Sequence, residues 1–342
     1  MLGSEFAIMG GAMTWVSERN LVSAISNAGG FGVIASGSMS PELLSTEISA
    51  VKARTTRPFG VNLITLHPRL DELIETCAEH RIGHVVLAGG LPTSAAMRRI
   101  KASGARVFCF APAIGLARKL VRMGADAIVI EGNEAGGHVG PVSTGVLAQE
   151  ILPGLSEVPV FVAGGIGRGE AVLAYLEMGA AGVQLGTRFV CARESIAHPR
   201  FKQAFIRASA RDAVTSPQLD PRFPVIPVRA LANPASARFL ALQREVIARF
   251  MSGELTQKAA QLEIEHFWAG ALRRAVIDGD IESGSLMAGQ SVGLVTREQT
   301  IGEIFEELIG QAVAVLRKRG EDGTGSAWPF PEDLSDGWRG RG

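Results

Sequence analysis

A short apolar run and the loop that follows it lie near the middle of the chain. They read Ala127-Ile128-Val129-Ile130 and Glu131-Gly132-Asn133-Glu134-Ala135-Gly136-Gly137-His138-Val139-Gly140. The apolar run predicts a buried strand, and the glycines let the backbone approach a flat or phosphorylated ligand closely. His138 has few apolar neighbours in this loop, and histidine titrates near neutral pH, which suits proton transfer. The alternative is a surface turn with an incidental histidine.

The same pattern of an apolar run, a small-residue turn and an amphipathic helix recurs from residue 7 to residue 190. Strands are predicted at residues 7–9, 32–34, 60–63, 84–87, 107–110, 127–130, 158–162 and 182–185, and helices at residues such as 21–28, 42–54, 95–102, 116–123 and 171–178. Alternating strands and helices form βαβ units with parallel pairing. We therefore expect an α/β fold, a closed (β/α)8 TIM barrel, rather than an open sheet.

This repetition ends after Arg188, so a different region begins there. We expect a barrel at residues 7–197, a smaller helical insertion or lid at 198–298, a closing helix at 299–319 and a poorly ordered tail at 320–342. Within the insertion, residues 198–210, 237–252 and 254–276 are predicted helices, and the proline-rich residues 214–236 are predicted to be irregular. Residues 3–6 resemble a cloning scar and are given no weight in the fold.

Composition excludes several classes of protein. Lys+Arg and Asp+Glu both number 34, and no basic stripe with interleaved aromatics is present, which argues against a nucleic-acid partner. A neutral chain gains no attraction to an anionic membrane surface, and we find no signal peptide and no apolar run approaching the ~18 residues that span a bilayer. Three scattered cysteines suit a reducing cytoplasm. Neither these nor the histidines have metal-ligand spacing, so no metal is expected.

Glycine turns follow the last two predicted strands, where (β/α)8 barrels commonly bind phosphate. Ala163-Gly164-Gly165 follows the seventh strand and Gly186-Thr187 follows the eighth. Backbone N–H groups in such turns form an anion site. The alternative is two tight turns without a ligand.

Other predicted strand ends carry groups suited to the rest of a ligand. The backbone at Gly11-Ala12-Met13 can lie against a flat ring, and the amides of Asn62 and Gln184 can bond to ring carbonyls or ribityl hydroxyls. Glu131 can accept from a hydroxyl or hold a loop; the alternative is a solvated charge. Gly289-Gln290-Ser291-Val292-Gly293 matches Gly-x-Ser-x-Gly, but no strand leads into it, which argues against a nucleophile elbow.

Seven segments together carry a family resemblance: Gly11–Val16, Ala28–Gly32, Arg57–Leu63, Glu134–His138, Ala163–Gly165, Gln184–Phe189 and Gly279–Val295. Through them the chain resembles the FMN-dependent nitronate monooxygenase and type II enoyl-acyl-carrier-protein reductase family over roughly residues 8–318. Two stretches, Glu134–Gly140 and Gly284–Gln290, are more similar to the reductase branch.

The resemblance implies an FMN-bearing barrel with His138 as the catalytic histidine, and a homodimer. It implies that FMN is bound by Gly11, Ala12, Met13, Thr14, Asn62, Glu131, Gly136, Gly137, Ala163, Gly164, Gly165, Gln184, Gly186, Thr187, Met287, Ala288, Gly289 and Gln290.

Two activities follow from the resemblance. The leading hypothesis is NAD(P)H-dependent reduction of the activated C=C bond of an enoyl thioester, with His138 supplying or positioning a proton. The alternative is a nitronate monooxygenase that oxidises alkyl nitronates with FMN and O2, with His138 as base or anion-orienting group. A third interpretation is a flavin-binding protein without turnover. The expected partner is a small-molecule or acyl-thioester substrate, not a nucleic acid or a membrane.

Overall fold

The computed structural model describes residues 1–321, and its centre is a parallel sheet of eight strands. The strands are β1 Ile8–Gly10, β2 Gly32–Ala35, β3 Phe59–Ile64, β4 His84–Ala88, β5 Arg106–Phe110, β6 Ala127–Glu131, β8 Val160–Ala163 and β9 Gly182–Leu185. Their order is β1-β9-β8-β6-β5-β4-β3-β2, and a parallel bridge between Met9 and Phe31 joins the two ends. The predicted (β/α)8 barrel is therefore confirmed, in a nearly closed form.

Side chains alternate between the barrel interior and the surrounding helices, as the pleat of a strand requires. On β6, Ala127 and Val129 belong to the cluster that fills the barrel, whereas Ile128 and Ile130 belong to the cluster packed under the helices. By the same alternation, the side chain of Glu131 lies on the inner side, at the end of the strand where barrels carry their chemistry.

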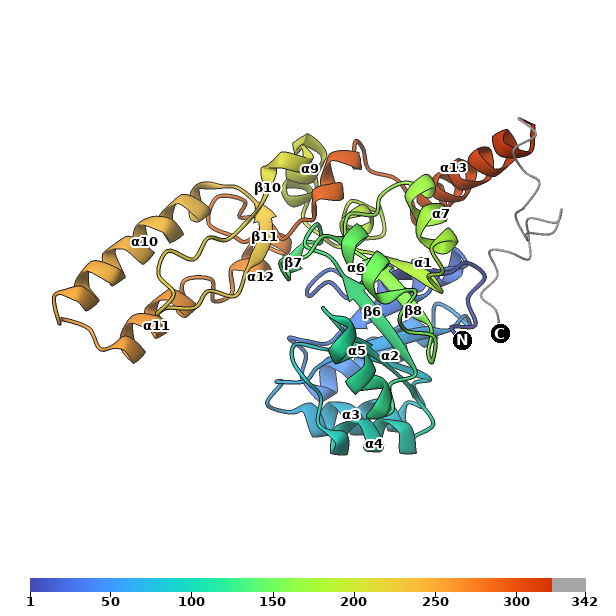
Figure 1. Cartoon of the computed structure of the whole chain (residues 1–342), viewed down its shortest axis with the longest axis horizontal. Coiled ribbons are helices and arrows are strands. Elements are labelled where there is room, and N and C mark those ends of the chain that lie inside the picture. Colours follow the sequence, from blue (N-terminus) through green and yellow to red (C-terminus); the bar gives the residue numbers. More distant parts are fainter. Residues whose placement is uncertain (322–342) are drawn as a thin grey trace.

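The helices of the barrel follow the strands in order. They are α1 Arg19–Asn27, α2 Pro41–Lys52, α3 Leu70–Glu79, α4 Ser94–Ala102, α5 Ile114–Arg122, α6 Thr144–Ile151, α7 Gly169–Glu177 and the short α8 Thr187–Val190. The closing helix is α13, Ile301–Glu321, which lies beside α7 (Figure 1). A Cβ on Gly169 would stand 1.8 Å from the carbonyl oxygen of Leu308, so glycine is required where these two helices meet. The rest of the predicted tail, residues 322–342, lies outside the described residues.

The insertion contains α9 Pro199–Arg207, the 3-10 turn η1 Ala210–Asp212, β10 Ala213–Thr215, β11 Val228–Leu231, α10 Pro234–Met251, α11 Gln257–His266, α12 Ala271–Val276 and the 3-10 turn η2 Gln290–Leu294. Helices α10 and α11 project away from the barrel, whereas β10 and β11 lie between them and the barrel (Figure 1). The projecting arm has its own small core, which includes Phe223, Phe239 and Val246. A lid function for the insertion remains a prediction.

Two predictions within the insertion were wrong. Residues 254–276 are not one helix, because Gly270 adopts a left-handed conformation (φ +67°) between α11 and α12. Residues 214–236 are not irregular throughout, because β10 and β11 pair antiparallel and β11 also pairs with β7, Gly137–His138. Four of the five prolines lie between β10 and β11, and the last of them, Pro227, directly precedes β11. Outside the strands, their missing N–H groups do not interrupt a ladder.

The first residues of the chain pack into the fold, so it was wrong to give residues 3–6 no weight in it. Leu2 is 4% exposed within the cluster that fills the barrel. The carbonyl of Met1 lies 3.0 Å from His84 Nε2 and also accepts from Arg106, at the N-terminal ends of β4 and β5. The Phe6 N–H donates to the Gly29 carbonyl (2.8 Å). This segment therefore closes the bottom of the barrel.

Candidate active site

The loops at the C-terminal ends of the strands bring most of the predicted residues to one end of the barrel. The loop after β6 reaches the end of β8, because the Gly132 N–H donates to the Ala163 carbonyl (3.1 Å). Ala12, in the loop after β1, packs half-buried against the inner cluster. Loops from strands on both sides of the β8–β9 pair therefore share this end of the barrel.

The loop after β1 contacts its neighbours on both sides. The Gly11 N–H donates to the carbonyl of the last residue of β9 (2.8 Å). A Cβ on Gly186 would lie 3.5 Å from the Met13 sulfur, and one on Gly37, after β2, would lie 3.6 Å from the Thr14 hydroxyl. This loop thus connects the predicted phosphate-binding turn to the β2 side of the mouth.

The loop that carries His138 is held at its base and at its tip. At the base, the Asn133 N–H donates to the Val142 carbonyl (2.8 Å). At the tip, His138 pairs with Val228 in the β7–β11 ladder. The imidazole remains exposed, yet partial desolvation by its surroundings lowers its pKa below the usual value. The neutral imidazole therefore predominates at pH 7, and it is accessible to a substrate.

Glu134 fastens this loop to two other elements. One of its carboxylate oxygens accepts from the backbone N–H and the hydroxyl of Thr144, both at 2.8 Å. The same hydroxyl lies 3.1 Å from the Gly164 carbonyl. A Cβ on Gly165 would be 3.0 Å from the Cβ of Glu134. Glu134 therefore fixes the histidine loop against α6 and the turn after β8. Its local motif gave no sign of this role, because the bond depends on where α6 begins, outside the motif.

The segment Met287–Gln290 docks on the histidine loop. A Cβ on Gly136 would stand 2.6 Å from the Gly289 nitrogen and 2.7 Å from the Ala288 carbonyl carbon. The Gln290 N–H donates to the Glu134 carbonyl (2.8 Å), and the Gly289 N–H donates to the Thr187 hydroxyl (2.9 Å). Three parts of the chain that are far apart in sequence, each predicted to bind the cofactor, are in this way brought into contact.

The turns after β8 and β9 have the features of an anion site. Gly164 (φ +97°) and Gly165 (φ +72°) adopt conformations that favour glycine. Within residues 1–321, the backbone N–H groups of Gly164, Gly165, Ile166 and Gly186 donate no hydrogen bond. Arg188, directly after the second turn, is 2% exposed, but its guanidinium pairs with the carboxylate of Glu307 on α13. Undonated N–H groups on two neighbouring turns can bind a phosphate group.

Polar groups at other strand ends differ in how fully they are bonded. The Asn62 amide donates to the Val86 carbonyl (3.0 Å). In the described part of the chain, the side chains of Gln184 and Glu131 make no hydrogen bond, so both can bond to a ligand. Burial raises the pKa of Glu131 to about 7, which distinguishes it from a solvated surface charge.

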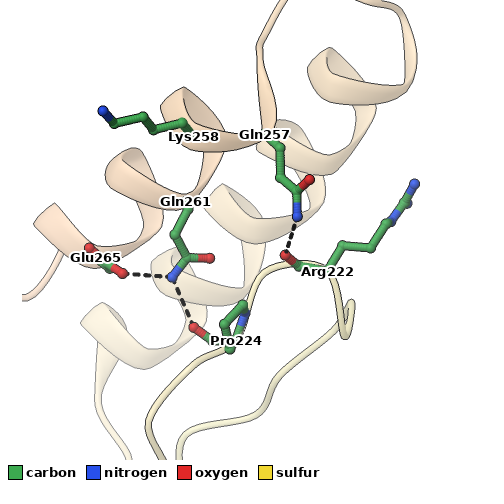
Figure 2. Close-up of a pocket in the computed structure, with 6 residues that line it drawn as sticks. All are labelled: Arg222, Pro224, Gln257, Lys258, Gln261 and Glu265. Carbon is green, nitrogen blue, oxygen red and sulfur yellow. Dashed lines mark hydrogen bonds between the residues drawn. The ribbon is translucent and has the colours of Figure 1, made fainter.

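A separate hollow lies on the projecting arm, and none of the predicted site residues lines it. Its lining consists of Arg222, Pro224, Gln257, Lys258, Gln261 and Glu265 (Figure 2). The amides of Gln257 and Gln261 donate to the carbonyls of Arg222 (3.2 Å) and Pro224 (3.0 Å). These bonds attach α11 to the loop before β11, so we interpret the hollow as a seam within the arm.

Residues 1–321 contain no group of three or more His, Cys, Asp or Glu side chains placed to hold a metal ion. None of the helices in the same range is both long enough and apolar enough to cross a membrane.

Comparison with known proteins adds a family and three relatives. The model of the nitronate monooxygenase family matches residues 1–86 and 69–311. A Mycobacterium tuberculosis protein named (3aS,4S,5R,7aS)-5-hydroxy-7a-methyl-1-oxo-octahydro-1H-indene-4-carboxyl-CoA dehydrogenase is 30% identical over 93% of this chain and 96% of its own. The structure of FabK from Thermotoga maritima aligns with a TM-score of 0.84 at 36% identity, covering 94% of this chain and 97% of FabK. A nitroalkane oxidase from Streptomyces ansochromogenes aligns with a TM-score of 0.76 at 25% identity, covering 92% and 98%.

Proposed function

The chain belongs to the nitronate monooxygenase family and is a flavin-type oxidoreductase, and from this premise we propose that it reduces the activated C=C bond of an enoyl thioester with FMN as cofactor and NAD(P)H as reductant. The family resemblance drawn from the sequence is thereby confirmed. The substrate, FMN and NAD(P)H are parts of the proposal.

The observation that carries the proposal is the docking of Met287–Gln290 on Gly136 beside His138. Both segments are the ones that resemble the reductase branch. The similarity to FabK, an enoyl-ACP reductase, supports the same activity. The relative from M. tuberculosis is named for a carboxyl-CoA substrate, which supports a thioester as the group recognised here.

The cofactor would be held by the backbone of two turns and by side chains at the strand ends. We assign its phosphate to the undonated N–H groups of Gly165 and Gly186, and its ring and ribityl hydroxyls to Gln184, Glu131 and the backbone at Gly11. When bound, the flavin would carry a hydride between the nicotinamide and the substrate.

A residue of the protein must supply the proton that is added to the substrate. Reduction of a 2-enoyl thioester adds a hydride at the β-carbon and a proton at the α-carbon. His138 is exposed and linked to the rest of the site by a braced loop, so it can hold the proton next to the α-carbon and regain one from solvent. A lowered pKa makes the protonated imidazole a readier donor.

Oxidation of alkyl nitronates with FMN and O2 is the second candidate. The family model and the nitroalkane oxidase structure favour it. In that reaction the neutral His138 would act as a base or orient the anionic nitronate, and no nicotinamide would be consumed.

Steady-state turnover separates the two candidates. The purified flavin-loaded enzyme is mixed with NADH or NADPH and crotonyl-CoA under argon, and separately with an alkyl nitronate in air. Oxidation of the nicotinamide that requires crotonyl-CoA and yields butyryl-CoA supports the proposal. Oxygen uptake with the nitronate, together with no reduction of crotonyl-CoA, would replace it with the alternative.

We further propose that residues 198–298 act as a lid, that the enzyme is a homodimer, and that it works in the cytoplasm. The three cysteines of the chain are buried and free, which supports a reducing location. Light scattering of the purified enzyme measures its oligomeric state.

A further inference from the structure

Arg229 is a buried arginine on β11, in the stretch of sequence predicted to be irregular. It is 8% exposed. Its Nε donates to the Asn133 carbonyl (2.7 Å), and one terminal nitrogen donates to the Ala213 carbonyl (2.5 Å). Asn133 is the residue that closes the base of the histidine loop, and Ala213 begins β10. One guanidinium thus joins the insertion to the loop that carries His138.

The backbone of Arg229 also helps to hold the histidine loop in place. In the β7–β11 ladder, Arg229 pairs with Gly137 and the preceding Val228 pairs with His138. The next residue, Ala230, forms a bridge with Met287. Since β10 occupies the other edge of β11, the histidine loop and Met287 share one edge of this strand. Arg229 therefore lies on the strand that pairs with both the histidine loop and Met287.

The chemistry of arginine suits this position. Burying a cation costs free energy unless its donors are bonded, and desolvation lowers the pKa of Arg229 accordingly. If this position only required apolar packing, a leucine or methionine would fill it without the free-energy cost of burying a charge. A planar guanidinium has donors in a rigid fork, so it can fix two carbonyls of separate elements at once, whereas the single ammonium of lysine is flexible and lacks this geometry.

We propose that Arg229 is a positioning residue for His138: it holds the base of the histidine loop to β11 and thereby fixes where the imidazole stands over the substrate. The inference rests on the proposed role of His138 in the reaction. Arg229 itself acts through the loop, not on the substrate or the flavin.

The first test is the variant R229K, with R238K as its matched control. Arg238 lies on the same insertion and also donates to a carbonyl, that of Glu282 (3.0 Å), but it has no bond to the histidine loop. We expect R229K to retain its flavin and its KM but to lose roughly 10- to 100-fold in kcat, because small misplacements of catalytic groups have effects of this size. R238K should behave like the wild type. A wild-type kcat for R229K would overturn the proposal.

A double-mutant cycle with H138A separates positioning from general damage. If Arg229 acts through His138, then kcat of R229K/H138A should match that of H138A alone, because the two residues work as one unit. Losses that multiply would show that Arg229 acts independently of His138 and would contradict the proposal.

A third measurement needs no substrate, so it remains valid even if the proposed reaction is wrong. The rate at which diethyl pyrocarbonate modifies each histidine is followed by mass spectrometry. We expect R229K to change the rate at His138 while the rate at the exposed His266 on the arm stays constant. Equal rates at His138 in the wild type and R229K would overturn the proposal, whichever substrate the enzyme uses.

Discussion

Gly136 and Gly289 meet backbone to backbone: a Cβ on Gly136 would stand 2.6 Å from the Gly289 nitrogen, and one on Gly289 would stand 2.9 Å from the Gly136 nitrogen. No real Cβ tolerates such distances from a backbone atom, so neither position accepts a side chain without a shift of the main chain. The contact is what places the reductase-like segment against the histidine loop.

The variant G136A should therefore separate these two segments. We expect it to bind flavin at least 10-fold more weakly, because shifting the loop by even 1 Å misaligns the site. Flavin absorbance per mole of protein and a fluorescence titration measure the effect. The control is G140A in the same loop, since a Cβ on Gly140 meets nothing within 4 Å. Equal flavin affinity for both variants would show that the contact is not needed.

Much of the barrel could be predicted because each strand is a contiguous buried run. Residues 127–130 show this, since all four side chains are apolar and each belongs to one of the two core clusters. The sheet formed by β10, β11 and β7 could not be predicted, because its strands are short and exist only through pairing with distant partners. Gly270 gave no local reason to prefer a break over a weak helix position.

For the candidate site, the local motif directed attention to His138, but not to what holds it. Glu134 was visible in the motif, yet its bond to Thr144 depends on where α6 begins. Arg229 was hidden in a proline-rich stretch, and its partner Asn133 is brought close only by the fold. Contacts of this kind carry no periodic signal in the sequence.

Glu131 gives a prediction about stability and pH. Its pKa is raised from 4.5 to about 7 in the folded protein, so between these values the folded state binds more protons than the unfolded state. Stability contributed by the protonated form is therefore present below pH 4.5 and is lost as pH rises to about 7. We expect E131Q to gain stability relative to the wild type from pH 5 to pH 8, measured by thermal unfolding of flavin-free protein. A constant difference across this range would contradict the assignment.

Leu2 tests the role of the first residues. It is 4% exposed inside the barrel, so L2A should lower the free energy of unfolding by roughly 2 to 5 kcal/mol. Urea denaturation followed by circular dichroism measures the loss. As a control, L43A removes a leucine that is 41% exposed on α2 and should change stability by about 0.5 kcal/mol or less. Equal effects would argue that the segment does not close the barrel.

The pH dependence of turnover reports the role of His138. If the protonated imidazole donates the proton, kcat/KM with the enoyl thioester falls as pH rises through a pKa below the usual 6.5. The variant H138Q should retain flavin, lose most turnover and lose this pH dependence. A profile that instead rises through the same pKa would identify His138 as a base, as nitronate oxidation requires.

The most direct test of the proposed activity is the absorbance of the bound flavin under argon after addition of NADH or NADPH. The proposal predicts rapid bleaching by at least one of them, and recovery of the oxidised spectrum when crotonyl-CoA is then added. A flavin that stays oxidised with both nicotinamides but is bleached by an alkyl nitronate would contradict the proposal and assign the enzyme to nitronate oxidation.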